Sequence, residues 1–249
     1  MNLLSKQTKT IPLVLHKVIR DQEFDGWEDI SISNLDYILD IVGESSTILK
    51  NNKPHESCWC LTFDDGNSSD YEIVFPRLLA QKSAAIFFIV LENVGKKGFL
   101  TWPQITEMYN YGMEFGSHSV SHKEMSALPD KLVSEEFIQS KSDLEDHIGG
   151  DVTSFSYPFG DYSRKTHELG LKAGYQVLFT SDHGLHSKNS NICPRNSIHS
   201  GMSKEVITNT MHPNLNLQLR WLLEDRLKKT IKYSIGNRNY KRLRDNIYL

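Results

Sequence analysis

The sequence has few of the features that mark disulfide-rich, membrane-spanning and nucleotide-binding proteins. Its three cysteines, Cys58, Cys60 and Cys193, cannot all pair, and the lone C-x-C pair lacks the second pair of a structural zinc site. We therefore expect them to be small core residues in a reducing compartment. No segment approaches the roughly 20 apolar residues of a membrane span. Neither G-x-G-x-x-G nor G-x-x-x-x-G-K-[ST] occurs, so no glycine-rich phosphate loop is expected.

Charge and the amino-terminal segment narrow the class further. A net charge of −3 is too small for wholesale binding to nucleic acid, so no nucleic-acid partner is expected. The first apolar run is only about six residues long and is followed at once by His16, Lys17 and Arg20, which is not a signal-peptide pattern. We therefore expect a cytoplasmic protein. The 249 residues contain no low-complexity linker and no internal repeat.

Apolar runs typical of strands alternate with helical patterns. The helices have start signals at Ser33, Ser69, Thr101 and Ser163, and several end at glycines. Such alternation predicts parallel strands joined by crossover helices. Without a phosphate loop, a distorted (β/α)7-type barrel fits better than an open sheet. The expected strands are Ile11–His16, Cys58–Phe63, Ala84–Val90, Met113–Gly116, Thr153–Tyr157, Tyr175–Thr180 and Ile192–Ile198.

The end of the chain differs in charge from the rest. From Asn214 onward there are nine Lys and Arg against three Asp and Glu, a net of +6, so the remainder carries −9. Leucines and isoleucines recur every four residues from Leu219 to Ile235, which predicts an amphipathic helix. We divide the chain into a barrel, residues 1–212, and a basic helical extension, residues 213–249. The extension either packs on the barrel with a solvated basic face or contacts an anionic membrane surface, at the inner face of the membrane.

Two short motifs at expected strand ends carry the chemistry. "LTFDDG" ends a strand with Asp64 beside Asp65, and two adjacent carboxylates repel unless they lie in solvent or a cation is bound. "GSHSVSHKEM" then places His118 four residues before His122, a spacing at which both imidazoles can bind one ion. With Asp64 or Asp65 as third ligand, these residues predict a divalent metal site. Zinc is favoured over cobalt or iron, although two histidines and a carboxylate suit all three.

Three ordered motifs, "TFDDG", "HSVSH" and "FSYPFG", resemble signatures of the polysaccharide deacetylases, carbohydrate esterase family 4 or the NodB-homology domain. The resemblance runs roughly from Ile11 to His212. It implies that Asp65, His118 and His122 bind the metal and that Asp64 is the general base. It also implies that the backbone N–H of Phe159 donates to the oxyanion. Tyr157, which would line the groove, and Pro158, which would shape the turn, are the substrate-binding residues that it implies.

The chain departs from the family pattern in two places. The third motif lacks the arginine that orients the catalytic aspartate in many members. The late motif that supplies the general acid has only a loose match in "NSIHSG", which contains His199. "PLVLHKV" resembles the first strand of the circularly permuted poly-N-acetylglucosamine deacetylases, which places the acid at His16. We favour His16 over His199. Arg195 is placed with the substrate-binding residues, and a salt bridge at a strand start is the alternative.

These motifs predict a metal-dependent hydrolase that removes an N-acetyl group from an amino sugar. The expected substrate is a lipid-linked or nucleotide-linked glycan intermediate in the cytoplasm. Removal of another N-acyl group, such as formyl, is a variant of the same chemistry. The alternative from another class is a catalytically silent sugar-binding or scaffold protein, which the missing arginine and the uncertain acid motivate.

Overall fold

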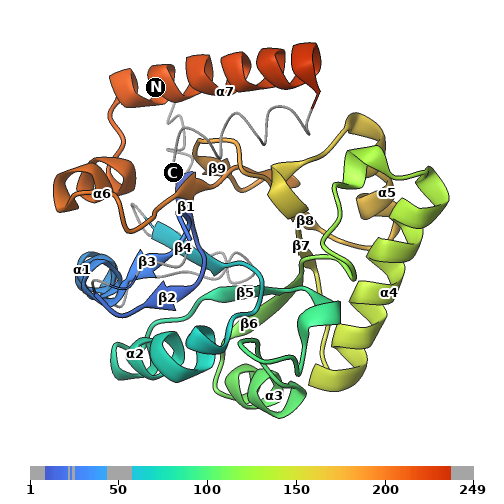
Figure 1. Ribbon diagram of the computed structural model, residues 1–249, viewed down its shortest axis with the longest axis horizontal. Helices are drawn as coiled ribbons and strands as arrows, with labels where there is room; N and C mark the ends of the chain where they lie inside the picture. The colour runs from blue at the N-terminus through green and yellow to red at the C-terminus, as the bar shows by residue number, and fades with distance from the viewer. Residues whose placement is uncertain (1–8, 22, 24–25, 44–57, 237–249) are drawn as a thin grey trace, which may run out of the picture.

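The computed structural model describes residues 9–21, 23, 26–43 and 58–236. Eight parallel strands follow one another around a nearly closed barrel, as Figure 1 shows. In order around the barrel they are β10 (Ile192–Cys193), β8 (Val177–Phe179), β7 (Ser154–Ser156), β6 (Glu114–Ser117), β5 (Ile86–Ile89), β4 (Cys58–Phe63), β1 (Lys9–Leu15) and β11 (Asn196–Ser197). The predicted barrel is thereby confirmed.

The strands at the two edges of this sheet, β10 and β11, follow each other directly in the chain. The single strand expected over Ile192–Ile198 is wrong, because β10 pairs with β8 while β11 pairs with β1 on the opposite edge. Only Pro194 and Arg195 separate them, so the chain crosses the gap between the two edges at this point. Proline donates no ladder hydrogen bond, which agrees with a strand break here. Three further short strands are β9 (His186–Ser187), antiparallel to β1, and the parallel pair β2 (Val18–Ile19) and β3 (Ile30–Ser31).

Helices cover the outside of the barrel, and α7 lies across one edge of the molecule (Figure 1). The start signals at Thr101 and Ser163 are confirmed as caps. The first helix is capped by Ser31 rather than Ser33. Ser69 does stand at the start of a helical turn, as expected, but its hydroxyl makes no capping hydrogen bond and accepts from the Val18 N–H instead. The α-helices are α1 (Ile32–Val42), α2 (Phe75–Ala80), α3 (Trp102–Asn110), α4 (Asp130–Ile148), α5 (Arg164–Lys172), α6 (Lys204–Met211) and α7 (Leu215–Ile235). A π-helical turn (Asp70–Val74) precedes α2, and 3-10 turns occupy Leu91–Asn93, Met125–Ala127 and Pro158–Gly160.

The apolar core has two parts, as expected for parallel strands that are buried on both faces. The larger part lies between the strands and the surrounding helices. The smaller part lies inside the barrel, where side chains from β4, β5, β8 and β10 meet: Cys60, Ile86, Phe88, Phe179 and Cys193. Cys60 and Cys193 are therefore buried core residues, as predicted. The side chain of Cys58 and residues 237–249 of the basic extension lie outside the described part of the chain.

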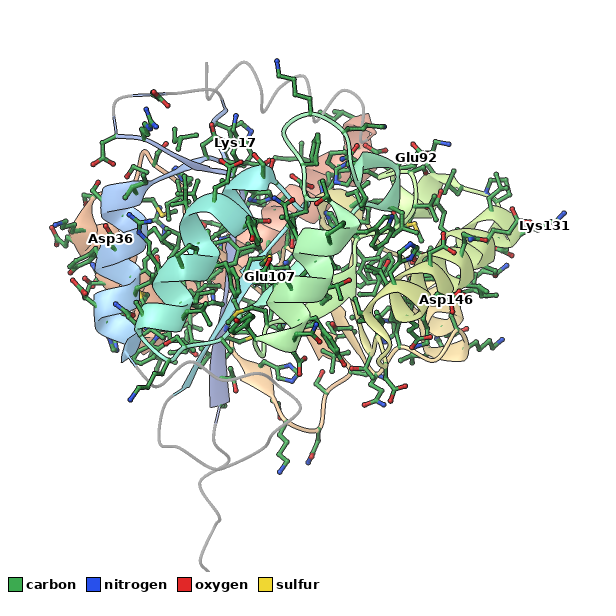
Figure 2. The ribbon with its side chains drawn as sticks, turned by 90° about the horizontal axis from the view of Figure 1, so that it is seen from below. Lys17, Asp36, Glu92, Glu107, Lys131 and Asp146 are labelled. Atoms are coloured by element: carbon green, nitrogen blue, oxygen red, sulfur yellow. The ribbon has the colours of Figure 1, made fainter. Side chains whose placement is uncertain are left out.

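Because the main strands are parallel, their carboxyl ends lie on one side of the barrel. Lys17, which follows β1, and Glu92, which follows β5, both lie along the same edge of the molecule in Figure 2. We call this side the rim. The side chains expected to carry chemistry follow β1, β4, β6, β7 and β11, so the fold gathers them there. None of the helices in the described ranges combines the length and apolar character needed to cross a bilayer.

Candidate active site

Asp64 and Asp65 directly follow β4, and their side chains lie in different environments. Asp64 is only 3 % exposed, whereas the side chain of Asp65 keeps 30 % of its surface at the rim. Asp65 has a φ of 76°, in the left-handed region, and Gly66 has a φ of 72°. A side chain on Gly66 would also approach Ile89 closely. This sharp turn separates the two carboxylates, and each has its own partners.

Arg195 is the partner of Asp64. Its Nη1 lies 2.6 Å from Asp64 Oδ1 and its Nη2 lies 2.7 Å from Asp64 Oδ2, a bidentate pair. The guanidinium also donates to the hydroxyls of Thr62 and Ser156 and to the carbonyl of Thr180. At 1 % exposure it cannot reach a substrate, so its placement among the substrate-binding residues is corrected to the alternative, a salt bridge.

Contacts inside the barrel stabilise the buried Asp64–Arg195 pair. The Arg195 guanidinium lies over the rings of Phe88 and Phe179, 5.4 and 5.8 Å from their centroids, above the small apolar cluster. Such cation–π contacts compensate part of the desolvation of a buried guanidinium. Burial alone would raise the pKa of Asp64, but the charges of Arg195 and then His118 hold it well below its usual range. Asp64 is therefore an ionised carboxylate held in one orientation.

Asp65 lies between the two histidines of the second motif. Its Oδ1 is 3.7 Å from His118 Nε2 and 3.4 Å from His122 Nε2. One ligand atom from each of the three residues falls within 4.8 Å of the others. Two ligand atoms bound to one ion at about 2.0–2.2 Å lie at most about twice that distance apart, so the two Asp65–histidine separations fit a single ion. Two nitrogens and an oxygen also form a donor set that divalent zinc accepts.

The orientation of His118 and the pKa of His122 both suit metal binding. His118 Nδ1 lies 2.8 Å from the carbonyl oxygen of Ser156, which fixes the ring and leaves Nε2 directed towards Asp65. Burial, with a further contribution from His118, lowers the pKa of His122 to about 4, so its imidazole is neutral at pH 7. A neutral imidazole nitrogen is the ligating species.

Left-handed backbone is concentrated at this site. Among the described residues, five non-glycine positions have positive φ: Asp65, Lys82, Ser119, His122 and Phe159. All but Lys82 belong to the three sequence motifs. Such conformations are unfavourable for residues with a Cβ and persist where surrounding contacts fix them. The "HSVSH" segment is thus a tight turn rather than a helix.

The two candidate acids occupy different parts of the rim. His16 follows β1, and its Nδ1 is buried with no hydrogen-bond partner in the described part of the chain. A positive charge on His16 would lower the pKa of both Asp64 and His122, so it lies within electrostatic range of the site. His199 follows β11, and its ring meets that of Trp27 edge-on, with centroids 6.1 Å apart. Burial lowers the pKa of His199.

The third motif is more buried than expected. Tyr157 is fully buried and its ring packs on those of Phe137, Phe155 and Tyr162, so its expected place along a substrate groove is wrong. Pro158 is buried as well, so its side chain is corrected from the substrate-binding set to a turn residue. Phe159 is 39 % exposed, and its ring lies 4.6 Å from that of His122. Of this motif, the Phe159 ring and the Ser156 carbonyl contact candidate metal ligands.

Sequence reasoning missed the orienting role of Arg195 and the part played by Ser156. The signal for Arg195 was an arginine inside an apolar strand pattern, directly after a proline, since a fully buried arginine needs a charged partner. Ser156 gave no comparable signal. Its hydroxyl accepts from Arg195 and donates to Asp64 Oδ2, while its carbonyl binds His118. It therefore links Asp64 and Arg195 to His118.

With this geometry the chain can be compared with known proteins. A sequence profile of the family described as polysaccharide deacetylase matches residues 51–178, about half of the chain, which includes the Asp64–Asp65 turn and both histidines. The chain belongs to the polysaccharide deacetylase family.

Its relatives include the putative polysaccharide deacetylase YxkH of Bacillus subtilis (strain 168), 32 % identical over 146 residues, or 58 % of this chain and 52 % of that protein. Chitin deacetylase 2 of Cryptococcus neoformans var. grubii is 25 % identical over 130 residues, covering 52 % of this chain and 28 % of the relative. The chain thus spans about half of the first relative's length and less of the second.

Solved structures share the fold. The Streptococcus pyogenes deacetylase PplD, in complex with acetate, superposes with a TM-score of 0.75 at 23 % identity, over 83 % of this chain and 100 % of that chain. IcaB from Ammonifex degensii superposes with a TM-score of 0.69 at 24 % identity, over 82 % and 97 % of the two chains.

Proposed function

We propose that this protein is a metal-dependent carbohydrate deacetylase that hydrolyses the N-acetyl amide of an amino sugar. The observation that carries the proposal is a compact Asp65–His118–His122 donor set beside a separate ionised carboxylate, Asp64. A sugar-binding protein needs no carboxylate held beside a metal site by a buried arginine. Zinc is the ion that we propose, because two imidazoles and a carboxylate suit it.

In the proposed reaction, water attacks the acetyl carbonyl carbon and the bond between that carbon and the amine nitrogen breaks. A divalent ion held by Asp65, His118 and His122 would supply Lewis-acid activation of the water and the carbonyl. Asp64 accepts the proton of the attacking water, and Arg195 keeps its carboxylate ionised and aligned. The backbone N–H of Phe159 donates to the carbonyl oxygen as it becomes negative. Acetate and the free amine are the products.

The leaving amine needs a proton, and we propose that His16 donates it. His16 directly follows β1, which pairs with β4. The Asp64 N–H donates to the carbonyl of Leu15, so the backbones that carry Asp64 and His16 lie side by side. The electrostatic coupling of His16 to both Asp64 and His122 supports this choice. His199 is the alternative acid, and it follows β11, which pairs with β1 on the side away from β4.

Names among the relatives refer to polysaccharide and chitin, so we propose an N-acetylated glucosamine glycan as substrate. Its carrier, its cytoplasmic location and the choice between acetyl and formyl stay predictions. The silent-scaffold alternative loses one of its motives, because Arg195 supplies the orienting guanidinium that the third motif lacks.

Release of acetate tests this function. Purified protein loaded with zinc is incubated with N-acetylglucosamine oligomers, with the matching N-formyl oligomers in parallel, and acetate and formate are measured. We expect acetate release that a chelator abolishes and added zinc restores. Formate release alone would identify the other N-acyl group, and release of neither acid would favour the sugar-binding alternative.

We further propose that α7 contacts an anionic membrane. The helix faces the barrel with Trp221, which stacks on His183 at 5.4 Å, and with Asp225, which accepts hydrogen bonds from the backbone N–H and the ring Nδ1 of His183. A leucine stripe faces outward, with 49–69 % of each side chain exposed: Leu215, Leu219, Leu222, Leu223 and Leu227. A helix that turns its apolar side away from its own barrel has the form of an interfacial helix.

Charge selects a lipid surface over a second copy of the chain. Arg226 lies within the outward face. Asp225 is buried, and the bordering Arg220 and Lys229 pair with Glu224 and Asp182. Two copies meeting through this face would bring like charges together. Anionic headgroups would instead attract the arginines and leave the leucines in the acyl boundary.

Flotation with vesicles tests this contact. The full chain should float with phosphatidylglycerol vesicles and much less with neutral vesicles or at high salt. The double variant Leu219→Ser/Leu223→Ser should lose flotation. Ile138→Ser, which changes an equally exposed residue of α4, should keep it. Equal flotation of both variants would overturn the proposal, and a dimer that the double variant abolishes would assign the stripe to self-association.

A further inference from the structure

Each backbone N–H from His118 to His122 donates a hydrogen bond. His118 N–H donates to the carbonyl of Ile89. The four following N–H groups all donate to side-chain oxygens: Ser119 to Ser117 Oγ, Val120 and Ser121 to Glu136 Oε2, and His122 to Ser119 Oγ. Of these acceptors, only the Glu136 carboxylate is charged. It therefore forms the strongest of these contacts, since charge-assisted hydrogen bonds are about twice as strong as neutral ones.

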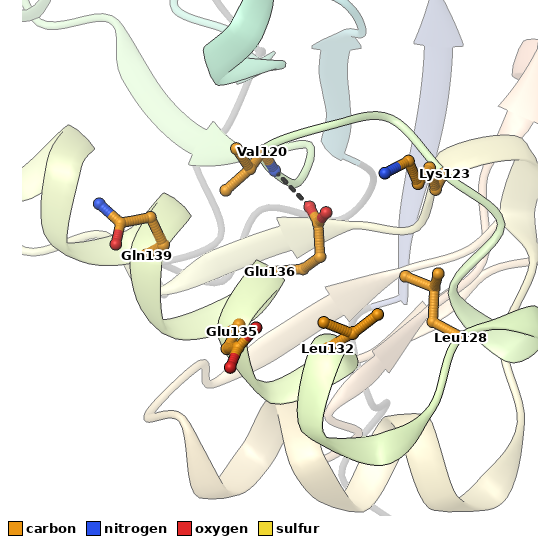
Figure 3. A pocket seen from close by; sticks show the side chains of 7 residues that line it. All are labelled: Val120, Lys123, Leu128, Leu132, Glu135, Glu136 and Gln139. Carbon is orange, nitrogen blue, oxygen red and sulfur yellow. Dashed lines mark hydrogen bonds between the residues drawn. The ribbon is translucent and has the colours of Figure 1, made fainter.

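Glu136 holds the middle of the loop from α4. Its Oε2 lies 2.8 Å from Val120 N and 3.0 Å from Ser121 N, and its Oε1 accepts from the Ser121 hydroxyl. Two successive N–H groups pointing at one carboxylate oxygen form an anion-binding nest. Figure 3 shows the Glu136 side chain reaching from α4 to Val120.

One helical turn farther along α4, Ser140 supports the start of the same loop. Its hydroxyl lies 2.6 Å from the hydroxyl of Ser117 and donates to the carbonyl of Glu136. The Ser117 hydroxyl in turn accepts from the Ser119 N–H. The two left-handed residues of the loop, Ser119 and His122, each follow one of these supported points. The loop conformation that directs His122 towards Asp65 is thus held by two neighbouring turns of one helix.

We propose that Glu136 is a positioning residue for the metal site: by binding the Val120 and Ser121 N–H groups, it fixes the strained loop that presents His122 to the ion. The inference rests on the proposed metal-dependent function. Outer contacts that orient ligand side chains typically change metal affinity by about 10–100-fold when removed. Glu136 does not touch the candidate ligands themselves, so its effect passes through the backbone of the loop.

The surroundings of Glu136 allow its carboxylate to be removed in a variant. An open hollow of about 310 Å³ lies beside it, lined by Val120, Lys123, Leu128, Leu132, Glu135, Glu136 and Gln139 (Figure 3). Water from this hollow can reach the two N–H groups when the carboxylate is removed, so Glu136→Ala is expected to fold. The chain also offers a matched control, because Glu135 lies next to Glu136 on α4 but pairs at the surface with Lys131.

The first measurement uses the metal-free protein, so it does not depend on the proposed activity. Amide hydrogen exchange is followed at residues 119–122 in wild type, Glu136→Ala and Glu135→Ala. We expect Val120 and Ser121 to exchange about tenfold faster or more in Glu136→Ala, because each loses a charge-assisted bond. Exchange in Glu135→Ala should match wild type.

The second measurement is the affinity for Zn²⁺, together with the visible spectrum of the Co²⁺-substituted protein. Glu136→Ala should bind Zn²⁺ about 10–100-fold more weakly and show an altered Co²⁺ spectrum, and Glu136→Gln, which keeps one acceptor oxygen, should fall between. Unchanged exchange, or faster exchange with unchanged affinity and spectrum, would overturn the positioning role. If wild type binds neither ion, the proposed function fails instead, and this outcome is distinct.

Discussion

Charged side chains are buried at the rim of the barrel, whereas apolar side chains are exposed along the outer helix α7. At the rim, charged groups are buried and paired, as in Asp64 with Arg195. Two of the four left-handed residues there, Ser119 and His122, donate backbone hydrogen bonds to serine side chains. Along α7, leucines are exposed, and a few polar contacts around Asp225 and Trp221 attach the helix to the barrel. The contrast separates the part of the molecule that fixes side-chain geometry from the part that leaves apolar surface exposed.

Among the substitutions at the rim, Asp64→Asn should reduce turnover most. The amide cannot accept the proton of the attacking water, so we expect turnover to fall by about 10²–10⁴-fold. Metal content should be retained, because Asp64 is not one of the three residues whose ligand atoms converge. Acetate release and metal analysis on the same preparation check both statements. Loss of the metal would make Asp64 a ligand, and full turnover would exclude it as the base.

Arg195→Met tests the buried pair by stability. Removing one partner leaves the Asp64 carboxylate buried and uncompensated, which should lower the free energy of unfolding by about 3–5 kcal/mol. Urea denaturation measures the change. In the double variant Asp64→Asn/Arg195→Met the loss should be smaller than the sum of the single losses. Strict additivity would mean that the pair contributes nothing beyond its separate residues.

His16→Ala and His199→Ala compare two positions on the same rim. We expect turnover to fall by about 10²-fold or more in His16→Ala, because the leaving amine loses its proton donor. His199→Ala should have a much smaller effect. Steady-state acetate release from N-acetylglucosamine oligomers measures both variants. The reverse order would assign the acid to His199.

Asp225→Asn tests the attachment of α7 and should have the smallest effect. Although burial raises the pKa of Asp225, hydrogen bonds and charge from His183 lower it below its usual value overall. A carboxyl with a lowered pKa stabilises the folded state above its unfolded value near 4, and that contribution is lost as pH falls through the folded value. We expect the contribution of Asp225 to the free energy of unfolding to be about 1 kcal/mol.

The fluorescence of Trp221, taken as the difference between wild type and Trp221→Phe, reports this attachment because the indole stacks on His183. The wild-type signal should change as pH falls below about 4. In Asp225→Asn that change should disappear. Identical pH profiles for the two proteins would show that another group holds α7.

Most of the fold could be predicted because local signals agreed with the tertiary structure. The strand Cys58–Phe63 has the expected bounds, since an apolar run ends there in two acids and a glycine. The Ser163 cap and the end of α4 at Gly149, with a φ of 68°, follow the same local rules. The break between β10 and β11 could not be predicted, because it depends on which strands flank the gap in the barrel.

The ligand side of the candidate site was predictable and the support around it was not. Asp65, His118 and His122 occur in short motifs, so their types and spacing were visible in the sequence. Arg195 lies 131 residues from Asp64, and Glu136 lies 16 residues from Val120 on another element. Their contacts arise only from barrel closure and from the packing of α4 beside the histidine loop. Tyr157 was misplaced for a related reason, since its motif did not reveal that neighbouring aromatic rings enclose it.

Titration of metal into chelator-treated wild type, with acetate release followed at each addition, tests the central claim most directly. The account predicts that activity on N-acetylglucosamine oligomers rises in proportion to Zn²⁺ and stops rising at one equivalent per chain. His122→Ala should need far more Zn²⁺ to reach its own plateau, since one of the three ligands is lost. Activity that is indifferent to Zn²⁺, or no acetate at any metal content, would contradict the account.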